Sequence, residues 1–177
     1  MKTKHLLKLI IVLTILSSCS SVKTTSDYDK SVNLSDYKTF GFTKESKELP
    51  TNDLVKNRIL NAISSNLKSK GLTESDNPDM LVDLGLKTKE KTDYQSTNYD
   101  MGGYYGRRWR VGTSIGTTNT REINYTEGTL VINLVDAKKD QLLWMGSGTS
   151  VVSDKSVKEE NITAGINKIL SSFPSLK

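Results

Sequence analysis

The chain has 177 residues, and its 25 lysines and arginines against 20 aspartates and glutamates give a formal net charge of +5. Lys2, Lys4 and Lys8 lie ahead of an apolar N-terminal run, so the remainder is nearly neutral and nucleic-acid binding is not indicated. The single cysteine, Cys19, excludes an internal disulfide. The single histidine, His5, precedes Cys19, so a mature chain that begins at Cys19 lacks the residues for Ser-His-Asp catalysis or a His/Cys zinc site. We therefore expect neither an enzyme nor a bound metal or cofactor.

The N-terminus has the pattern of a cleaved secretory signal over residues 1–18. Its apolar run from Leu9 to Leu16 is much shorter than the roughly 20 residues that a membrane-spanning helix needs. A cysteine follows the small residues at the end of this run. Its thiol is suited to take a diacylglycerol, and a further acyl chain on the freed amine makes the attachment stable. The segment resembles a bacterial lipobox formed by Leu16, Ser17 and Ser18, with lipidation predicted at Cys19.

The residues after the cysteine bear on the destination of the protein. Ser20 and Ser21 stand where an aspartate is typical of retention in the inner membrane, so this segment resembles the class of lipoproteins sorted to the outer membrane. We expect a lipid-anchored protein of the outer membrane that faces the periplasm, with the membrane as its first partner. An ordinary secreted protein with a chance cysteine is the alternative.

Residues 19–35 are rich in serine, threonine and lysine, and we expect them to form a lipidated flexible tether. A single domain is then expected over residues 36–177. It begins with a strand at 37–43, followed by a helix that has Thr51 or Asn52 as its N-cap and ends before Gly71. The apolar side chains of this helix recur on one face; they are Val55, Ile59, Ala62, Ile63 and Leu67.

Three further strands and a second helix complete the expected domain. Alternating apolar residues predict strands over 79–91, 122–135 and 141–152, with a bulge or kink at Gly128. The run Ser156–Glu159 has the spacing of a capping box, which predicts a helix after it. The order β-α-β-β-β-α predicts an α+β two-layer sandwich, with an antiparallel-rich, four-stranded sheet and two helices on one face.

Short motifs recur along the domain in a particular order. They are Tyr37–Phe40, Pro78–Val82, Gly128–Ile132, Asp136-Ala137, Leu143–Gly146 and Phe173-Pro174. Together they resemble a Gram-negative, Bacteroidetes-like family of lipoproteins that share a periplasmic domain of unknown function. The resemblance covers nearly all of the mature chain. It implies the envelope location and the single domain, and it brings no catalytic residues.

The segment between the second and third predicted strands combines glycines with tyrosines, arginines and a tryptophan. Aromatic faces and guanidinium groups suit stacking on a sugar ring or gripping an acidic partner, such as an envelope protein or glycan. The alternative is an extended hairpin at a sheet edge, closed by glycine and kept soluble by charge. The candidate contact residues are Tyr99, Tyr104, Tyr105, Arg107, Arg108, Trp109 and Arg110.

These observations lead to three hypotheses about function. The first is a non-catalytic outer-membrane lipoprotein whose domain binds an envelope partner or stabilises an envelope assembly. The second is a carboxylate-dependent hydrolase of cell-wall glycan, which needs two carboxyl groups facing each other across a cleft. The third is a carrier of a small apolar ligand between sheet and helices, which needs a sizeable internal cavity.

Overall fold

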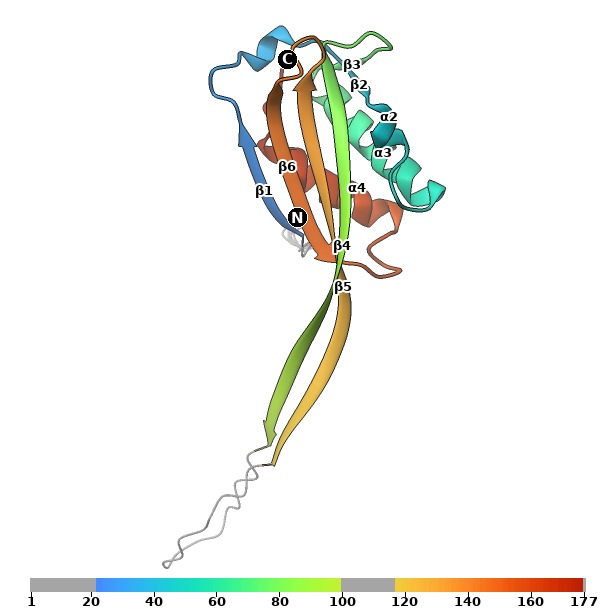
Figure 1. Cartoon of the computed structure of the whole chain (residues 1–177), viewed down its shortest axis with the longest axis vertical. Helices are drawn as coiled ribbons and strands as arrows, with labels where there is room; N and C mark the ends of the chain where they lie inside the picture. The colour runs from blue at the N-terminus through green and yellow to red at the C-terminus, as the bar shows by residue number, and fades with distance from the viewer. Residues whose placement is uncertain (1–21, 100–116, 177) are drawn as a thin grey trace, which may run out of the picture.

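A computed structural model describes residues 22–99 and 117–176, which form a mixed sheet with helices packed on one face (Figure 1). The strands are β1 (Lys23–Tyr28), β2 (Thr39–Phe42), β3 (Thr73–Glu74), β4 (Met80–Tyr99), β5 (Thr117–Asp136) and β6 (Leu142–Val151). Their spatial order is β1-β6-β5-β4-β2-β3. β2 is parallel to both β3 and β4, and the other neighbouring pairs are antiparallel.

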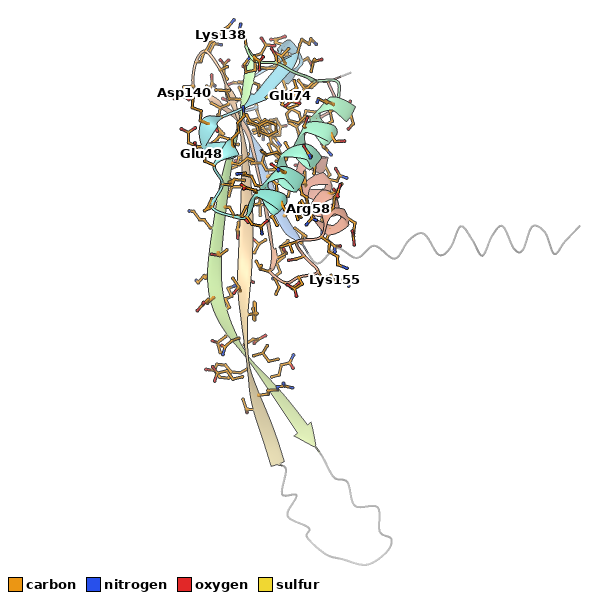
Figure 2. All side chains as sticks on the ribbon, turned by 90° about the vertical axis from the view of Figure 1, so that its right-hand side faces the viewer. Glu48, Arg58, Glu74, Lys138, Asp140 and Lys155 are labelled. Carbon is orange, nitrogen blue, oxygen red and sulfur yellow. The ribbon has the colours of Figure 1, made fainter. Side chains whose placement is uncertain are left out.

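Two long helices and several short ones complete the fold. They are η2 (Leu34–Asp36), α2 (Lys44–Lys47), α3 (Asp53–Ser69), α4 (Glu159–Ile169) and η3 (Leu170–Ser172). α3 and α4 lie side by side on one face of the sheet, and no described helix covers the other face (Figure 1, Figure 2). Large side chains fill the space between the two layers, among them Trp144, Phe40 and Phe173, each at most 1% exposed. No helix of the described ranges combines the length and the hydropathy that crossing a membrane requires.

The helix α3 lies where the sequence predicts it. The side-chain oxygen of Asn52 accepts a hydrogen bond from the Val55 N–H at 2.9 Å, which makes Asn52 the N-cap. Every residue of the predicted apolar stripe is buried. Gly71 follows the helix with a φ of 105°, a conformation that glycine adopts without steric cost.

The predicted four-stranded sheet is wrong, because the sheet has six strands and is mixed. Two strands lack the apolar alternation by which a strand is recognised. β1 has the polar sequence KTTSDY, and it is held by backbone pairing with β6 from Lys23–Thr149 to Tyr28–Trp144. It lies inside the segment that we expected to be a flexible tether. β3 is only two residues long, which is too short for any periodic pattern.

The central strands are longer than their sequence pattern predicts. β4 continues to Tyr99 and β5 begins at Thr117, because cross-strand pairing extends through polar residues. Gly128 is paired in regular register with Thr88, so it marks no bulge in this pair. The irregularity lies instead between Leu134 and Val135, in the pairing of β5 with β6.

The second long helix starts three residues later than its predicted capping box. The hydroxyl of Ser156 accepts a hydrogen bond from Ser153 N–H and donates one to Ser153 C=O, both at 2.8 Å. Because these bonds occupy the hydroxyl locally, it does not cap the helix. α4 begins at Glu159 with no side-chain cap at Lys158.

Two glycines of β6 allow α4 to pack directly against the sheet. A Cβ atom at Gly146 would overlap the indole ring of Trp144 and lie 2.9 Å from Ile169 Cγ2. A Cβ atom at Gly148 would lie 2.6 Å from Ile169 Cδ1. Any side chain at these positions would push the helix or the indole ring away, so the two glycines set the distance between the layers.

Candidate functional site

A polar pocket of about 580 Å³ opens at the end of the sheet where β4 begins and β5 ends. The segment before β2, the start of β4 and the turn between β5 and β6 form its walls. Polar and charged side chains predominate in its lining, among them Asn33, Tyr37, Asp79, Asp136, Lys138 and Lys139. Tyr37, Asp79 and Asp136 belong to motifs that carry the family resemblance, so the most recognisable residues of the sequence meet at this end.

Asp136 joins the turn after β5 to the segment before β2. Its Oδ2 accepts a hydrogen bond from the Tyr37 hydroxyl at 2.7 Å, and its Oδ1 accepts bonds from the Lys138 and Lys139 N–H groups at 2.8 Å each. The carboxylate is only 7% exposed. The bond from Tyr37, followed by the two backbone donors, lowers the pKa of Asp136. Burial, and then the bond to Asp136, raises the pKa of Tyr37 to about 12, so the phenol remains a donor.

Asp79 joins the start of β4 to β2 in a similar way. Its Oδ2 accepts hydrogen bonds from the Thr39 hydroxyl at 2.8 Å and from the Thr39 and Lys38 N–H groups at 3.1 Å each. The Thr39 side-chain bond is the first cause of the lowered pKa of Asp79. Both carboxylates therefore hold neighbouring segments together while they stay charged at neutral pH.

This arrangement bears on the possible chemistry of the pocket. A glycosidase needs one carboxyl group whose pKa is raised so that it delivers a proton to the leaving group. Asp79 and Asp136 have the opposite shift, and their lone pairs accept bonds from within the domain. Within the described residues, no group of three or more histidine, cysteine or acidic side chains is arranged to hold a metal ion. The contacts of Asp79 and Asp136 are those of structural residues.

The opposite end of the sheet carries a long two-stranded extension, which we call the arm and define as residues 90–99 and 117–126 (Figure 1). β6 ends at Val151, opposite Glu127, so over the arm only β4 and β5 pair with each other among the described strands. The rungs run from Glu90–Thr126 to Tyr99–Thr117, a length of about 30 Å at strand rise. Tyr94 is 65% exposed there, and at the base of the arm the Val152 N–H donates a hydrogen bond to the Thr126 carbonyl oxygen at 2.8 Å.

Four lysines gather where the arm meets the sheet, on the face without helices. Period-two alternation puts Lys87, Lys89 and Lys91 on one face of β4. Residues that are paired directly across neighbouring strands have their side chains on the same face of the sheet. One row of such pairs runs across the sheet from β4 to the start of β1. This row consists of Lys87, Thr129, Thr149 and Lys23. We call Lys23, Lys87, Lys89 and Lys91 the basic strip. Our sequence analysis missed it, although lysines at i, i+2 and i+4 within a strand indicate one charged face.

The chain is fixed to the domain at Val22, directly before β1. Lys168 Nζ of α4 donates a hydrogen bond to the Val22 carbonyl oxygen at 2.7 Å. The Val22 side chain lies beside Gly148 and Gly165. A Cβ atom added at Gly148 would lie 3.1 Å from Val22 Cγ1, and one added at Gly165 would lie 3.7 Å from Val22 Cγ2. Only Ser20 and Ser21 separate this fixed point from Cys19 in the sequence.

The predicted site residues lie mostly outside the described residues. This holds for the lipobox residues Leu16, Ser17 and Ser18, for Cys19, and for the contact residues Tyr104, Tyr105, Arg107, Arg108, Trp109 and Arg110. Tyr99 is the last residue of β4 and is paired with Thr117 at the end of the arm. Trp144, which stands in a resemblance motif, is part of the core at 1% exposed.

Comparison with known proteins places the chain in a family. A family model described as a domain of unknown function (DUF4136) matches residues 24–175. The chain belongs to this family. The DUF4136 match begins inside β1 and ends after η3, so it spans the sheet, the arm and both long helices. No curated protein matches the chain.

Comparison with solved structures gives one similar fold at low sequence identity and one weaker similarity. A PDZ domain protein from Parabacteroides distasonis is 18% identical with a TM-score of 0.53, covering 88% of this chain and 36% of that protein. The chain thus spans about a third of that protein's length. A PelC dodecamer from Paraburkholderia phytofirmans is 11% identical with a TM-score of 0.47, covering 85% of this chain and 95% of that one.

Proposed function

We propose that the mature protein is an outer-membrane lipoprotein, anchored through Cys19 and facing the periplasm, whose domain is a non-catalytic binding or assembly module of the envelope. The lipobox pattern of Leu16, Ser17 and Ser18 supports the anchor. The fixed position of Val22 is consistent with it, because the folded domain begins within three residues of the predicted lipid.

The arm is the observation that carries the binding role. It is a two-stranded ribbon that no third described strand joins, and at its base the Val152 N–H donates a hydrogen bond to the Thr126 carbonyl oxygen at 2.8 Å. Such ribbons are only marginally stable alone in water, and a partner that packs on them or adds a strand stabilises them. Of the predicted contact residues, Tyr99 ends the first strand of the arm and the others, from Tyr104 to Arg110, follow it in sequence. We propose that they reach the same partner.

The two rival functions receive less support. Hydrolysis of cell-wall glycan is not supported by Asp79 and Asp136 of the polar pocket, because both have lowered pKa values, the opposite of what a proton donor needs. A carrier of an apolar ligand needs space between the layers. The space around Trp144, Phe40 and Phe173 is filled by these side chains themselves.

Metabolic labelling with a fatty acid tests the anchor. We expect label on the wild-type protein and its loss, together with loss from the membrane fraction, in the Cys19→Ala variant. A Ser21→Ala variant is the matched control and should keep both. An unlabelled wild-type protein, or unchanged fractionation of Cys19→Ala, would contradict the proposal.

Photocrosslinking in intact cells tests the binding role of the arm. A photoreactive residue at Tyr94 should capture a discrete envelope component, because this side chain is 65% exposed on the arm. Leu54 on α3 is 61% exposed and provides the matched control away from the arm. Combined replacement of Arg107, Arg108 and Trp109 by alanine should abolish the adduct and leave folding intact. Equal adducts at both positions, or none at Tyr94, would argue against a binding arm.

A further inference from the structure

The open face of the sheet, which no described helix covers, has opposite charge at its two ends. The basic strip lies at the end where the arm emerges, with Glu127 as the acidic residue paired among it. Further from the arm, one row of the same face carries Asp27 on β1 and Asp83 on β4, which are connected through Met145 and Asn133. The positive charge is therefore concentrated beside the start of β1.

The start of β1 is also the place where the predicted anchor joins the domain. Three peptide units link Cys19 to Val22, so the two Cα atoms are at most about 11 Å apart. Lys23 follows Val22 directly and shares its row with Lys87. A lipid on Cys19 therefore brings the basic strip within reach of the headgroups, and the inference rests on the proposed anchor in this respect.

The arm begins beyond this row and is about 30 Å long. If it pointed straight at the bilayer, Asp93, Arg121 and Glu122 would enter the hydrocarbon, which is costly for charged side chains. An arm inclined to the membrane normal avoids this cost. Where the arm leaves the sheet, one face carries Lys87, Lys89 and Lys91 together with Glu127 and Asp93, whereas the other face carries Glu90 and no lysine. The lysine face therefore has the net positive charge that suits an anionic surface.

We propose that the basic strip docks on anionic phospholipid headgroups of the membrane that holds the lipid anchor. The docked strip fixes the orientation of the domain: the arm end of the open face lies nearest the membrane, the arm is inclined to the membrane normal, and the polar pocket is at the opposite, more distant end of the sheet. Lysines near an anionic surface each strengthen binding several-fold, and salt screens this attraction beyond a Debye length of about 10 Å at 0.1 M.

Vesicle sedimentation tests the docking without the lipid. The mature chain with Cys19→Ser is mixed with vesicles of phosphatidylethanolamine and phosphatidylglycerol, or of phosphatidylcholine alone. We expect weak binding to the anionic vesicles that falls as the salt concentration rises, and none to the neutral ones. Because this chain carries no acyl group, its binding is independent of the anchor, and fatty-acid labelling tests the anchor separately.

Two triple variants locate the binding surface. Replacing Lys23, Lys87 and Lys89 by glutamine should weaken binding by about tenfold or more. The control replaces Lys30, Lys138 and Lys139, which are exposed; Lys138 lies at the far end of the domain (Figure 2). This control removes the same charge and should change affinity by less than about twofold, because these lysines lie beyond the screening distance.

Each contrary outcome is informative. Equal weakening by both triple variants would mean that net charge alone causes binding, and it would overturn the proposal. Binding to neutral vesicles, or no binding to anionic vesicles at low salt, would overturn it as well. Sedimentation of the chain as an oligomer that the strip variant dissolves would assign the surface to a second copy of this chain instead.

Discussion

The two ends of the sheet differ in how they hold their charges. At the pocket end, Asp136 and Asp79 accept three hydrogen bonds each and join segments distant in sequence. At the arm end, the lysines of the basic strip lie on an open face, and one of them forms an exposed ion pair. Charges that are satisfied within the domain stabilise the fold, whereas charges that face solvent are available to a partner. The comparison assigns stability to one end and interaction to the other.

Removing aromatic side chains from the two regions should give the largest contrast. Trp144 is 1% exposed and packs edge-on against Phe173, with the ring centroids 5.6 Å apart. We therefore expect Trp144→Ala to lower the free energy of unfolding by about 3–5 kcal/mol. Tyr94→Ala on the arm should cost about 0.5 kcal/mol or less. Urea unfolding followed by circular dichroism measures both. A large loss with Tyr94→Ala would mean that the arm belongs to the cooperative fold.

Glycine substitutions test the contact between α4 and the sheet at a smaller scale. Gly146→Ala forces a Cβ atom against Trp144 and Ile169, and we expect a loss of about 1–3 kcal/mol. Gly85→Ala is the matched control on the open face, where the nearest atom to the new Cβ is Val131 Cβ at 3.8 Å. This change should stay within about 0.5 kcal/mol. Similar losses at both sites in thermal unfolding would refute the close packing at Gly146.

Removing one hydroxyl tests the stabilising role of the pocket end. Tyr37→Phe deletes the donor to Asp136 and keeps the ring, and we expect the free energy of unfolding to fall by about 1–2 kcal/mol. Tyr28→Phe is the matched control, because that side chain is 52% exposed on β1 and should have almost no effect. Denaturant titration of both variants measures the difference. Equal stability of the two variants would show that the Tyr37–Asp136 hydrogen bond does not stabilise the fold.

Acid should weaken the pocket end. Asp136 and Asp79 have pKa values below that of an unfolded aspartate, near 3.9, so their stabilisation is complete above about pH 5. It is lost as the pH falls through their folded pKa values, because protonation then favours the unfolded chain. Asp136→Asn should therefore flatten the dependence of unfolding free energy on pH between about pH 5 and 3. An unchanged slope in unfolding curves across that range would contradict the assignment.

The smallest effect on stability is expected at the arm root, where the arm joins the rest of the sheet at Lys91 and Glu127. Lys91 Nζ lies 2.6 Å from Glu127 Oε2, and the two side chains are 41% and 22% exposed. Exposed pairs of this kind contribute about 0–1 kcal/mol, so a double-mutant cycle with Lys91→Gln and Glu127→Gln should give a small coupling that salt reduces. A coupling well above this range would show that the arm root is fixed like the pocket end.

The sequence predicted the elements whose apolar periodicity is complete. The helix cap at Asn52 and the buried stripe from Val55 to Leu67 are as expected, because burial repeats every three to four residues there. β1 escaped prediction because its residues are polar and it is recruited to the sheet by backbone pairing with β6, which leaves no apolar pattern in the sequence. The predicted capping box at Ser156 failed because its hydroxyl bonds locally to Ser153.

The candidate site was less accessible from sequence than the fold. Asp79 and Asp136 are separated by more than fifty residues in sequence, and no short spacing indicates that both border the same pocket. The basic strip combines β1 with β4 through a row of pairs that depends on the full strand order. The period of Lys87, Lys89 and Lys91 was the one local signal. The anchor and the aromatic contact residues stay predictions, since they lie outside the described residues.

Fluorescence quenching in a bilayer tests the central claim most directly, namely that the end of the sheet with the arm faces the membrane that anchors the chain. The lipidated protein is reconstituted with nitroxide-labelled lipids, and a fluorophore is attached at Thr25→Cys on the open face or at Lys139→Cys near the pocket. The account predicts strong quenching at position 25 and little at position 139. Equal quenching at both positions, or stronger quenching at 139, would contradict it.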